Sequence, residues 1–211
     1  MDLFKKIGND EDPSSLSFQF RKRRFDQFIR VLNVTKADKI IDIGGYEQIW
    51  EGSGLEENVT LLNLSFQEKK PKFKYIECDA CNISNVGNRS FDVAFSNSVI
   101  EHVGDFQRQQ NFASEAIRIS KRYWIQTPNK YFPIEPHMLF PFFEFLPKRA
   151  KKFVALNWKY SHFKRFNLDI DDELSRLRLI TSEEMKSLFP GSSIYKEKVI
   201  GLTKSIVAYK S

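Results

Sequence analysis

The sequence predicts an α/β fold in which a mostly parallel sheet is doubly wound, with helices on both faces. Two observations predict it. Short apolar runs that suit buried strands alternate with stretches whose apolar residues recur at helical spacing, and five such runs end in small or polar residues. Alternation of this kind indicates βαβ units and a parallel sheet. The length of 211 residues suits one such domain.

An amphipathic helix comes first in the predicted order. Apolar residues recur at helical spacing between Ser15 and Leu32, with arginines interleaved. Residues 1–14 are polar and include the run Asp-Glu-Asp-Pro, so we expect them to form a flexible leader. The folded domain is therefore expected to span residues 15–211.

Five strands follow, each a short apolar run. They are predicted over residues 39–45, 59–64, 73–78, 91–96 and 122–126. A helix is predicted over residues 105–119, between the fourth and fifth strands, because apolar residues mark one of its faces. This order of strands and helices indicates βαβ units in a parallel sheet.

The end of the chain predicts a short helix and a hairpin. Thr181 is followed by Glu184, the signature of a capping box, which opens a helix over residues 182–189. Residues 193–199 and 204–209 then predict two antiparallel strands.

Residues 130–168 interrupt the rhythm with four prolines, clustered aromatic residues and many Lys and Arg. We expect an inserted helical lid after the fifth strand. Two alternatives stay open for its basic-aromatic stretch: phosphate and base contacts with nucleic acid, or contact with an anionic membrane surface. The net charge of +6 is modest for a nucleic-acid-binding protein, and no dedicated motif is present, which favours the lid.

Composition excludes several classes of protein. Hydrophobic residues make up 41% and charged residues 28%, as in ordinary globular domains, and no apolar run is long enough to cross a membrane. The only cysteines, Cys78 and Cys81, form a C-x-x-C pair without the further ligands that zinc requires. We expect reduced thiols, no metal and a cytoplasmic location.

The residues that end the predicted strands share one property: they are small or polar, although the strands that precede them are apolar. They are Asp42-Ile-Gly-Gly45, Asn63, Asp79-Ala80, Ser96-Asn97-Ser98 and Thr127-Pro128-Asn129. Ligands of parallel sheets bind at the carboxyl ends of the strands, and glycine lets a ligand approach the backbone. A helix directly after the first strand is expected to offer its amides to an anionic group. The match to a dinucleotide fingerprint is weak, because Tyr46 and Ile49 occupy two of its glycine positions.

These strand ends resemble the class I S-adenosylmethionine-dependent methyltransferases, in particular their small-molecule, type 11-like domain. The matching stretches are Ile40-Ile-Asp-Ile-Gly-Gly45, Glu77-Cys-Asp-Ala80 and the run from Phe91 to Val103. The resemblance implies a seven-stranded Rossmann-like sheet that closes with the antiparallel C-terminal hairpin. It also implies S-adenosylmethionine as cofactor and methyl transfer to an oxygen or nitrogen of a small-molecule, sugar or lipid-linked acceptor.

The resemblance carries over a set of cofactor-binding residues. They are Asp42, Gly44, Gly45, Asn63, Asp79, Ala80, Asn97, Ser98 and Val99. Asp42 is implied to lie under the glycine turn, and Asp79 to accept a hydrogen bond from the adenine amino group. Asn97, Ser98 and Val99 are implied to form the wall beside the methionine part of the cofactor. Two departures from the family pattern stand out. Tyr46 and Gln48 replace glycines, and Asn63 replaces an acid that would hold the ribose hydroxyls.

Three residues are candidates for acid–base chemistry: His137, Glu135 and His102. His137 and Glu135 follow the fifth strand, where prolines would stiffen the loop, and a neutral imidazole suits a general base near neutral pH. His102 faces the pocket or caps the following helix; both readings stay open. The aromatic run Phe140–Phe145 is expected to bind the acceptor. The alternative function is a non-catalytic binding protein with the same fold.

Overall fold

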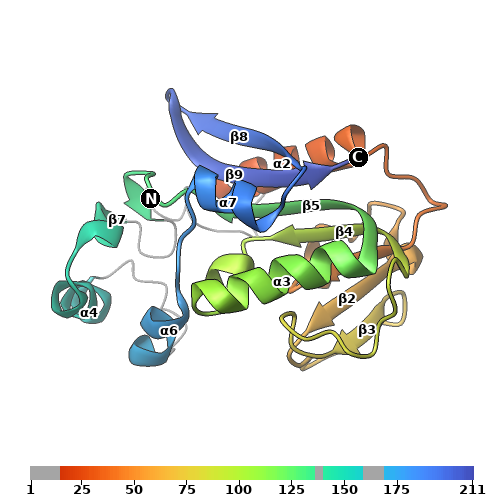
Figure 1. Ribbon diagram of the computed structural model, residues 1–211, viewed down its shortest axis with the longest axis horizontal. Coiled ribbons are helices and arrows are strands. Elements are labelled where there is room, and N and C mark those ends of the chain that lie inside the picture. The colour runs from red at the N-terminus through yellow and green to blue at the C-terminus, as the bar shows by residue number, and fades with distance from the viewer. Residues whose placement is uncertain (1–14, 136–139, 159–168) are drawn as a thin grey trace.

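The computed structural model describes residues 15–135, 140–158 and 169–211. The predicted leader, residues 1–14, lies outside these ranges. The main feature is a seven-stranded sheet of order β3-β2-β1-β4-β5-β9-β8 (Figure 1). The pairs among the first five strands are parallel, whereas β9 joins β5 antiparallel and β8 joins β9 antiparallel. The predicted fold class, with its antiparallel C-terminal hairpin, is confirmed.

The strands lie close to the positions predicted from the sequence. They are β1 (Ile40–Ile43), β2 (Val59–Asn63), β3 (Lys74–Glu77), β4 (Phe91–Asn97), β5 (Ser120–Pro128), β8 (Ser193–Val199) and β9 (Leu202–Lys210). The largest difference is β5, which is longer at both ends than predicted. Its ladder with β9 continues to the pair of Pro128 with Ser205, so pairing extends the strand beyond its apolar run.

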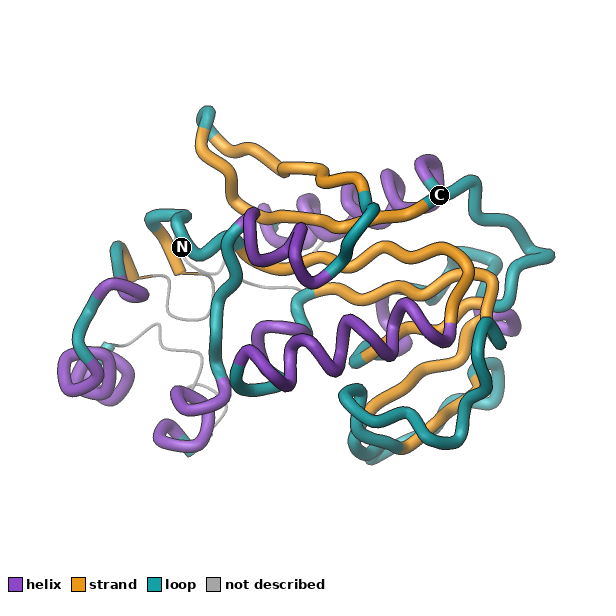
Figure 2. Tube along the Cα trace, viewed as in Figure 1, coloured by secondary structure: helices purple, strands orange, loops and turns teal. Residues whose placement is uncertain are grey.

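Helices cover both faces of the sheet (Figure 2). They include α2 (Leu16–Val31), which packs on one face, and α3 (Phe106–Ile119) and α7 (Ser182–Leu188), which pack on the other. The Ser15 hydroxyl caps α2 by accepting a hydrogen bond from the amide of Phe18 at 3.1 Å. The predicted capping box of α7 is present, with the side chains of Thr181 and Glu184 each accepting from the other's backbone.

Alternation along β1 divides the core into two halves. Ile41 and Ile43 belong to the cluster that packs against α3 and α7. Ile40 belongs to the opposite cluster, under α2, where Phe28 and Trp50 are fully buried. Side chains of successive strand residues point to opposite faces, so one short strand supports both layers.

The prediction of a helix directly after the first strand is wrong. Between β1 and β2 the chain forms only two 3-10 helices, η1 (Glu47–Ile49) and η2 (Glu56–Asn58). Gly52 and Gly54 separate them with φ of +76° and +74°. These left-handed conformations stop a right-handed helix, so no long row of helical amides follows the glycine turn.

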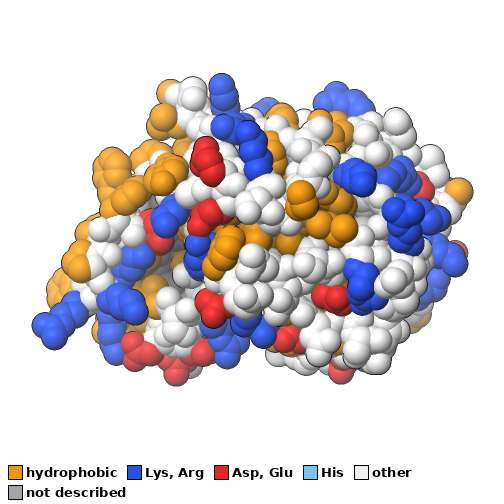
Figure 3. All heavy atoms as spheres, viewed as in Figure 1, with side chains coloured by type: hydrophobic (Ala, Val, Ile, Leu, Met, Phe, Trp, Pro, Cys, Tyr) orange, Lys and Arg blue, Asp and Glu red, His pale blue; other side chains and the backbone are white. Residues whose placement is uncertain are grey.

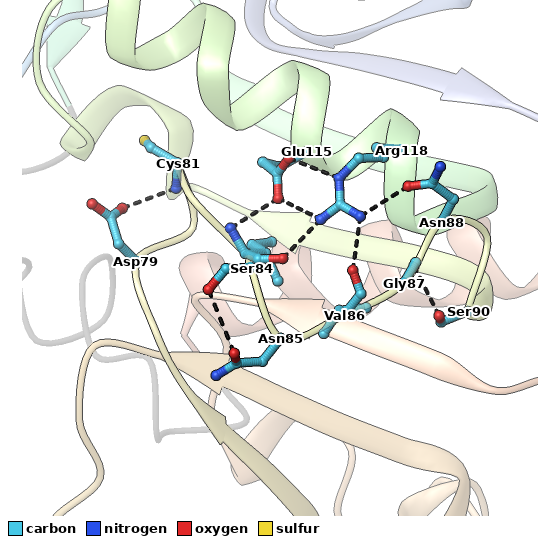
Figure 4. A network of polar contacts seen from close by, with 11 residues as sticks. Asp79, Cys81, Ser84, Asn85, Val86, Gly87, Asn88, Ser90, Glu115 and Arg118 are labelled. Carbon is cyan, nitrogen blue, oxygen red and sulfur yellow. Dashed lines mark hydrogen bonds and ion pairs between the residues drawn. The ribbon is translucent and has the colours of Figure 1, made fainter.

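The loop from β3 to β4 also has no helix, and side chains from α3 satisfy its backbone instead (Figure 4). Arg118 donates to the carbonyl oxygens of Ile83 and Val86, both at 2.7 Å. Glu115, which is ion-paired with Arg118, accepts from the amide of Ile83 at 2.8 Å. One pair on α3 therefore replaces the hydrogen bonds that a helix would supply.

The segment after β5 folds around a small core of its own. It contains β6 (Ile134–Glu135), β7 (Phe140–Pro141), η4 (Phe143–Phe145) and α4 (Lys148–Asn157), and it packs on α6 (Ile170–Arg176). Phe143 and Ala155 are buried at its centre. The insertion thus includes a helix and a small two-stranded sheet; its action as a lid stays a prediction. Within the described ranges, no helix has the length and apolar character needed to cross a membrane.

We predict that Arg118→Ala lowers the free energy of unfolding by about 3 kcal/mol, because buried carbonyls and Glu115 lose a charged partner. Urea denaturation measures the loss. Lys121→Ala is the matched control, since it breaks an exposed ion pair with Asp92 and should cost at most about 1 kcal/mol. Equal losses in the two variants would show that Arg118 does not hold the loop.

Candidate functional site

A cavity of about 550 Å³ opens where the carboxyl ends of β1 to β4 meet. Its volume lies within the range of small-molecule sites. Five of the predicted cofactor residues line it: Gly44, Asn63, Asp79, Ala80 and Val99. The sheet order therefore brings together residues that lie far apart in the sequence, as expected for the open end of a parallel sheet.

The turn after β1 requires both of its glycines. Gly44 has φ of +77°, and a Cβ atom there would lie 2.5 Å from a methyl group of Val99. A Cβ atom on Gly45 would lie 1.8 Å from Oδ2 of Asp42. The Gly44 amide donates to the carbonyl of Leu62 at 2.7 Å, which ties the turn to β2. Packing as well as backbone conformation excludes larger residues here.

Asp42 lies beneath this turn and is buried, with 1% of its surface exposed. The indole N–H of Trp50 donates to its Oδ2 at 2.7 Å, while Oδ1 has no hydrogen-bond partner. Burial raises the pKa of Asp42 to about 7, although the Trp50 hydrogen bond lowers it in part. Asp42 thus supports the turn from below and is not part of the cavity wall.

Asn63 ends β2 at the wall of the cavity. Its Oδ1 accepts from the amide of Leu64 at 3.1 Å, which orients the side chain. Its Nδ2 is buried and has no hydrogen-bond partner. A buried unsatisfied donor costs free energy, so this amide is suited to a ligand that supplies an acceptor.

Asp79 and Arg108 form an ion pair at the cavity. One Arg108 nitrogen, Nη2, lies 3.0 and 2.8 Å from the two carboxylate oxygens of Asp79. The amide of Cys81 also donates to Asp79, at 2.9 Å. Desolvation opposes ionisation of Asp79, but Arg108 and the amide outweigh it and lower the pKa of this carboxyl. Asp79 is therefore a fixed, ionised acceptor.

Sequence reasoning missed Arg108. It belongs to the first turn of α3, 29 residues from Asp79, and its Nε donates to the carbonyl of Val103 at 2.6 Å. No spacing rule connects the two positions. One signal in the sequence could have located it. Asp105 is a typical helix-capping residue, so it marks the start of α3 and places Arg108 in the first turn, near the strand ends.

Asn97 and Ser98 differ from their predicted roles, because neither lines the cavity. Oδ1 of Asn97 accepts from Nη1 of Arg24 on α2 at 2.9 Å, on the other face of the sheet. The Ser98 hydroxyl donates to Oε1 of Gln126 at 3.0 Å. Asn97 is the last residue of β4, and Ser98 lies beyond it with φ of +58°, so the chain has left the strand before Val99. Val99 alone of the three reaches the cavity.

His102 lines the cavity from η3 (Ile100–His102). Asp105 caps α3, so of the two positions that the sequence allows, His102 takes the one beside the cavity. Its neighbour Glu101 is fully buried, and Oε2 of Glu101 accepts from the hydroxyl of Thr127 at 3.0 Å. The predicted His137 lies outside the described residues. Glu135 pairs with Phe140 in the small sheet of β6 and β7.

The aromatic run after β5 does not line the cavity. Phe143 is buried in the segment's own core, whereas Phe142 and Phe145 are exposed to solvent. The expectation that this run binds the acceptor stays a prediction. Arg176 of α6, which the sequence did not single out, lines the cavity instead.

The two cysteines are free thiols. Cys78 lines the cavity, and Cys81 is buried with its thiol donating to the carbonyl of Arg108 at 3.2 Å. Burial raises the pKa of Cys81 to about 11, so it is an unreactive thiol near neutral pH. Among the described residues, no three potential metal ligands cluster.

Comparison with known proteins adds to this geometry. A family model described as a methyltransferase domain matches residues 48–122, from η1 into β5. No curated protein matches the chain.

Several solved structures have a similar fold. An S-adenosylmethionine-dependent methyltransferase of Archaeoglobus fulgidus is 15% identical, with a TM-score of 0.53 and coverage of 93% of this chain and 100% of that one. A protein of Anabaena variabilis, described as a methyltransferase of an antibiotic biosynthesis pathway, is 17% identical with a TM-score of 0.51. That match covers 83% of this chain, which spans 64% of the Anabaena protein.

A third similar structure was solved with ligands. It is phosphoethanolamine N-methyltransferase 2 of Haemonchus contortus, bound to phosphomonomethylethanolamine and S-adenosylhomocysteine. The identity is 16% and the TM-score 0.52, and the match covers 88% of this chain and 39% of that one.

The fold and the location of the cavity define the class. This chain has the fold of the class I S-adenosylmethionine-dependent methyltransferases, and the resemblance predicted from the sequence is confirmed. Within that class, its central part matches the methyltransferase domain family. S-adenosylmethionine is the cofactor of this class.

We predict that Asp42→Asn changes how stability depends on pH. An acid whose pKa is raised in the folded state keeps its proton there while the unfolded chain ionises. The free energy of unfolding of the wild type should therefore fall, relative to the variant, as pH rises from about 4 to about 7, and be level above that. Urea titrations at several pH values measure the difference. Parallel pH profiles would contradict the assignment.

Proposed function

We propose that the chain binds S-adenosylmethionine in the cavity at the ends of β1 to β4 and transfers its methyl group to an oxygen or nitrogen of a small acceptor. One observation carries the proposal. Gly44, Asn63 and Asp79, which come from the ends of three different strands, line a single cavity of about 550 Å³. The class of fold supports the same conclusion.

The residues present fit this cofactor. The buried Nδ2 of Asn63, which has no partner, suits a ribose hydroxyl as acceptor. Asp79 is an ionised acceptor for the adenine amino group. Its ion pair with Arg108 does not exclude that role, because a carboxylate offers about four acceptor positions. Gly44 leaves the backbone open to close approach.

When bound, S-adenosylmethionine supplies an electrophilic methyl group on a positively charged sulfur. The protein's share of the reaction is then alignment of the acceptor and removal of its proton. Holding two reactants in line can account for roughly 7–11 kcal/mol of a barrier. We assign removal of this proton to His102, which is among the described residues that line the cavity. His137 and Glu135 remain candidates from the sequence.

The acceptor is proposed to be a small molecule, a sugar or a lipid-linked intermediate. Arg108 and Arg176 both line the cavity, and each has an acidic partner, Asp79 and Asp172 respectively. A guanidinium has five N–H donors, so each arginine keeps donors that suit an acceptor carrying a carboxylate or phosphate group.

We predict that the chain binds S-adenosylhomocysteine at one site and that Asp79→Ala raises the dissociation constant about 10- to 100-fold, because a charge-assisted hydrogen bond is lost. Isothermal titration calorimetry measures both. Asp92→Ala is the matched control, because this acid lies near the start of β4, does not line the cavity and pairs with Lys121. Absence of binding by the wild type would overturn the proposal, and equal affinities would place adenine elsewhere.

We also predict that His102→Ala lowers methyl transfer about 10²- to 10⁴-fold if the acceptor must lose a proton. Transfer of labelled methyl groups into fractionated cell extract identifies an acceptor and then measures the rate. His102→Gln controls for lost packing, since it keeps a polar side chain of similar length without a titrating ring. Full activity of both variants across the pH range would exclude His102 as the base. Cofactor binding without any transfer would favour a non-catalytic binding protein.

A further inference from the structure

Exposed apolar side chains gather at one end of the molecule. Four of them are Phe142, Phe145, Phe153 and Leu156. They come from the consecutive stretch of β7, η4 and α4, which packs around the small core of Phe143 and Ala155. Figure 3 shows hydrophobic atoms collected over this end, with Lys and Arg beside them. We call these four exposed residues, with Lys148, Arg149 and Lys152, the docking surface.

The outer side of α4 combines both kinds of side chain. Arg149, Lys152, Phe153 and Leu156 are all exposed, and their spacing of three and four residues places them along one side of the helix. Phe153 alone is 67% exposed. A helix that needed only to cover the domain would turn such groups inward. Here the inward side is already occupied by Val154 and Ala155.

Phe142 strengthens the case. Its φ of +56° is in the left-handed region, which bulky residues rarely adopt, and its side chain is 61% exposed. Neither burial nor backbone preference within the domain therefore explains a phenylalanine at this position. Phe145, which stacks against Tyr131 with ring centroids 6.5 Å apart, extends the apolar surface beyond the helix.

The charge of the docking surface indicates what kind of partner would be complementary to it. Residues 140–158 contain four basic residues and one acid. Lys151 is paired with that acid, Glu144, and Lys152 with Asp171. Within the part of the chain that the structure describes, Lys148 and Arg149 form no ion pair. Cations beside exposed apolar groups are complementary to an anionic bilayer, whose headgroups attract the charges while the rings enter the interface.

Two other partners fit less well. The centre of a protein–protein interface is depleted of lysine, whereas lysine and arginine lie among the apolar groups here. Single-stranded nucleic acid stacks on aromatic rings, and Leu156 cannot supply a stacking face.

We propose that the docking surface binds the surface of an anionic lipid bilayer. Docking is peripheral and reversible: aromatic and aliphatic side chains enter the interfacial layer, and Lys148 and Arg149 contact lipid phosphates. Because α6 packs against α4 and carries Arg176 at the cavity, docking brings the cavity near the bilayer. Docking near the bilayer implies that the methyl acceptor carries a lipid tail, a consequence that rests on the proposed function.

The test is sedimentation of the full chain with vesicles of phosphatidylcholine, with and without phosphatidylglycerol, in the absence of cofactor. We expect binding to the anionic vesicles that weakens with salt. The double variant Phe142→Gly, Phe153→Ser should lower the partition coefficient at least about tenfold, because two interfacial rings are lost. Lys148→Glu with Arg149→Glu should weaken binding to the anionic vesicles specifically.

Ile200→Gly is the matched control. Ile200 is also apolar, 97% exposed and at positive φ, but it lies in the turn between β8 and β9. It should bind vesicles like the wild type. Equal binding by the double variant and the wild type, or no binding to anionic vesicles, would overturn the proposal. Two further outcomes would overturn it if the wild type does not bind vesicles. In one, the wild type forms a dimer that the double variant has lost; in the other, the wild type binds single-stranded RNA and the double variant does not. Cofactor affinity is measured separately, so failure of the proposed function can be told apart from failure of membrane binding.

Discussion

The hydrogen bond from Trp50 to Asp42 fixes the centre of this structure. It joins the end of β1 to the aromatic cluster under α2, because the Trp50 ring also packs edge-on against Phe28 and Phe95. Asp42 in turn occupies the space that a side chain on Gly45 would need. One buried carboxylate therefore determines the path of the glycine turn, and the turn determines where the cavity begins.

Side chains take the place of helices in two connections of the sheet. The connection after β1 depends on Trp50, the one after β3 on Arg118 and Glu115, and the cavity edge on Arg108. Long-range contacts of this kind order loops that local hydrogen bonds alone would leave mobile. The same arrangement leaves the strand ends open, which is the condition for a ligand to reach Asn63 and the glycine turn.

The sequence was sufficient for the sheet but not for the connections. Strand runs such as residues 59–64 are recognisable by their apolar and β-branched residues, and Thr181 with Glu184 marked a helix start correctly. The missing helix after β1 depends on positive φ at Gly52 and Gly54, which composition alone does not reveal. Arg108 was missed because only the tertiary fold brings it to Asp79. Long-range pairs have no local signature.

Hydrogen exchange with and without S-adenosylhomocysteine tests the central claim most directly, namely that the strand ends form one cofactor site. The prediction is slower exchange of backbone amides at residues 43–46, 62–65, 78–81 and 99–104, which surround the cavity. Amides at residues 86–90, in the loop that precedes β4, and in the turn between β8 and β9 should not change. Protection confined to those outer segments, or absent from the strand ends, would contradict the account.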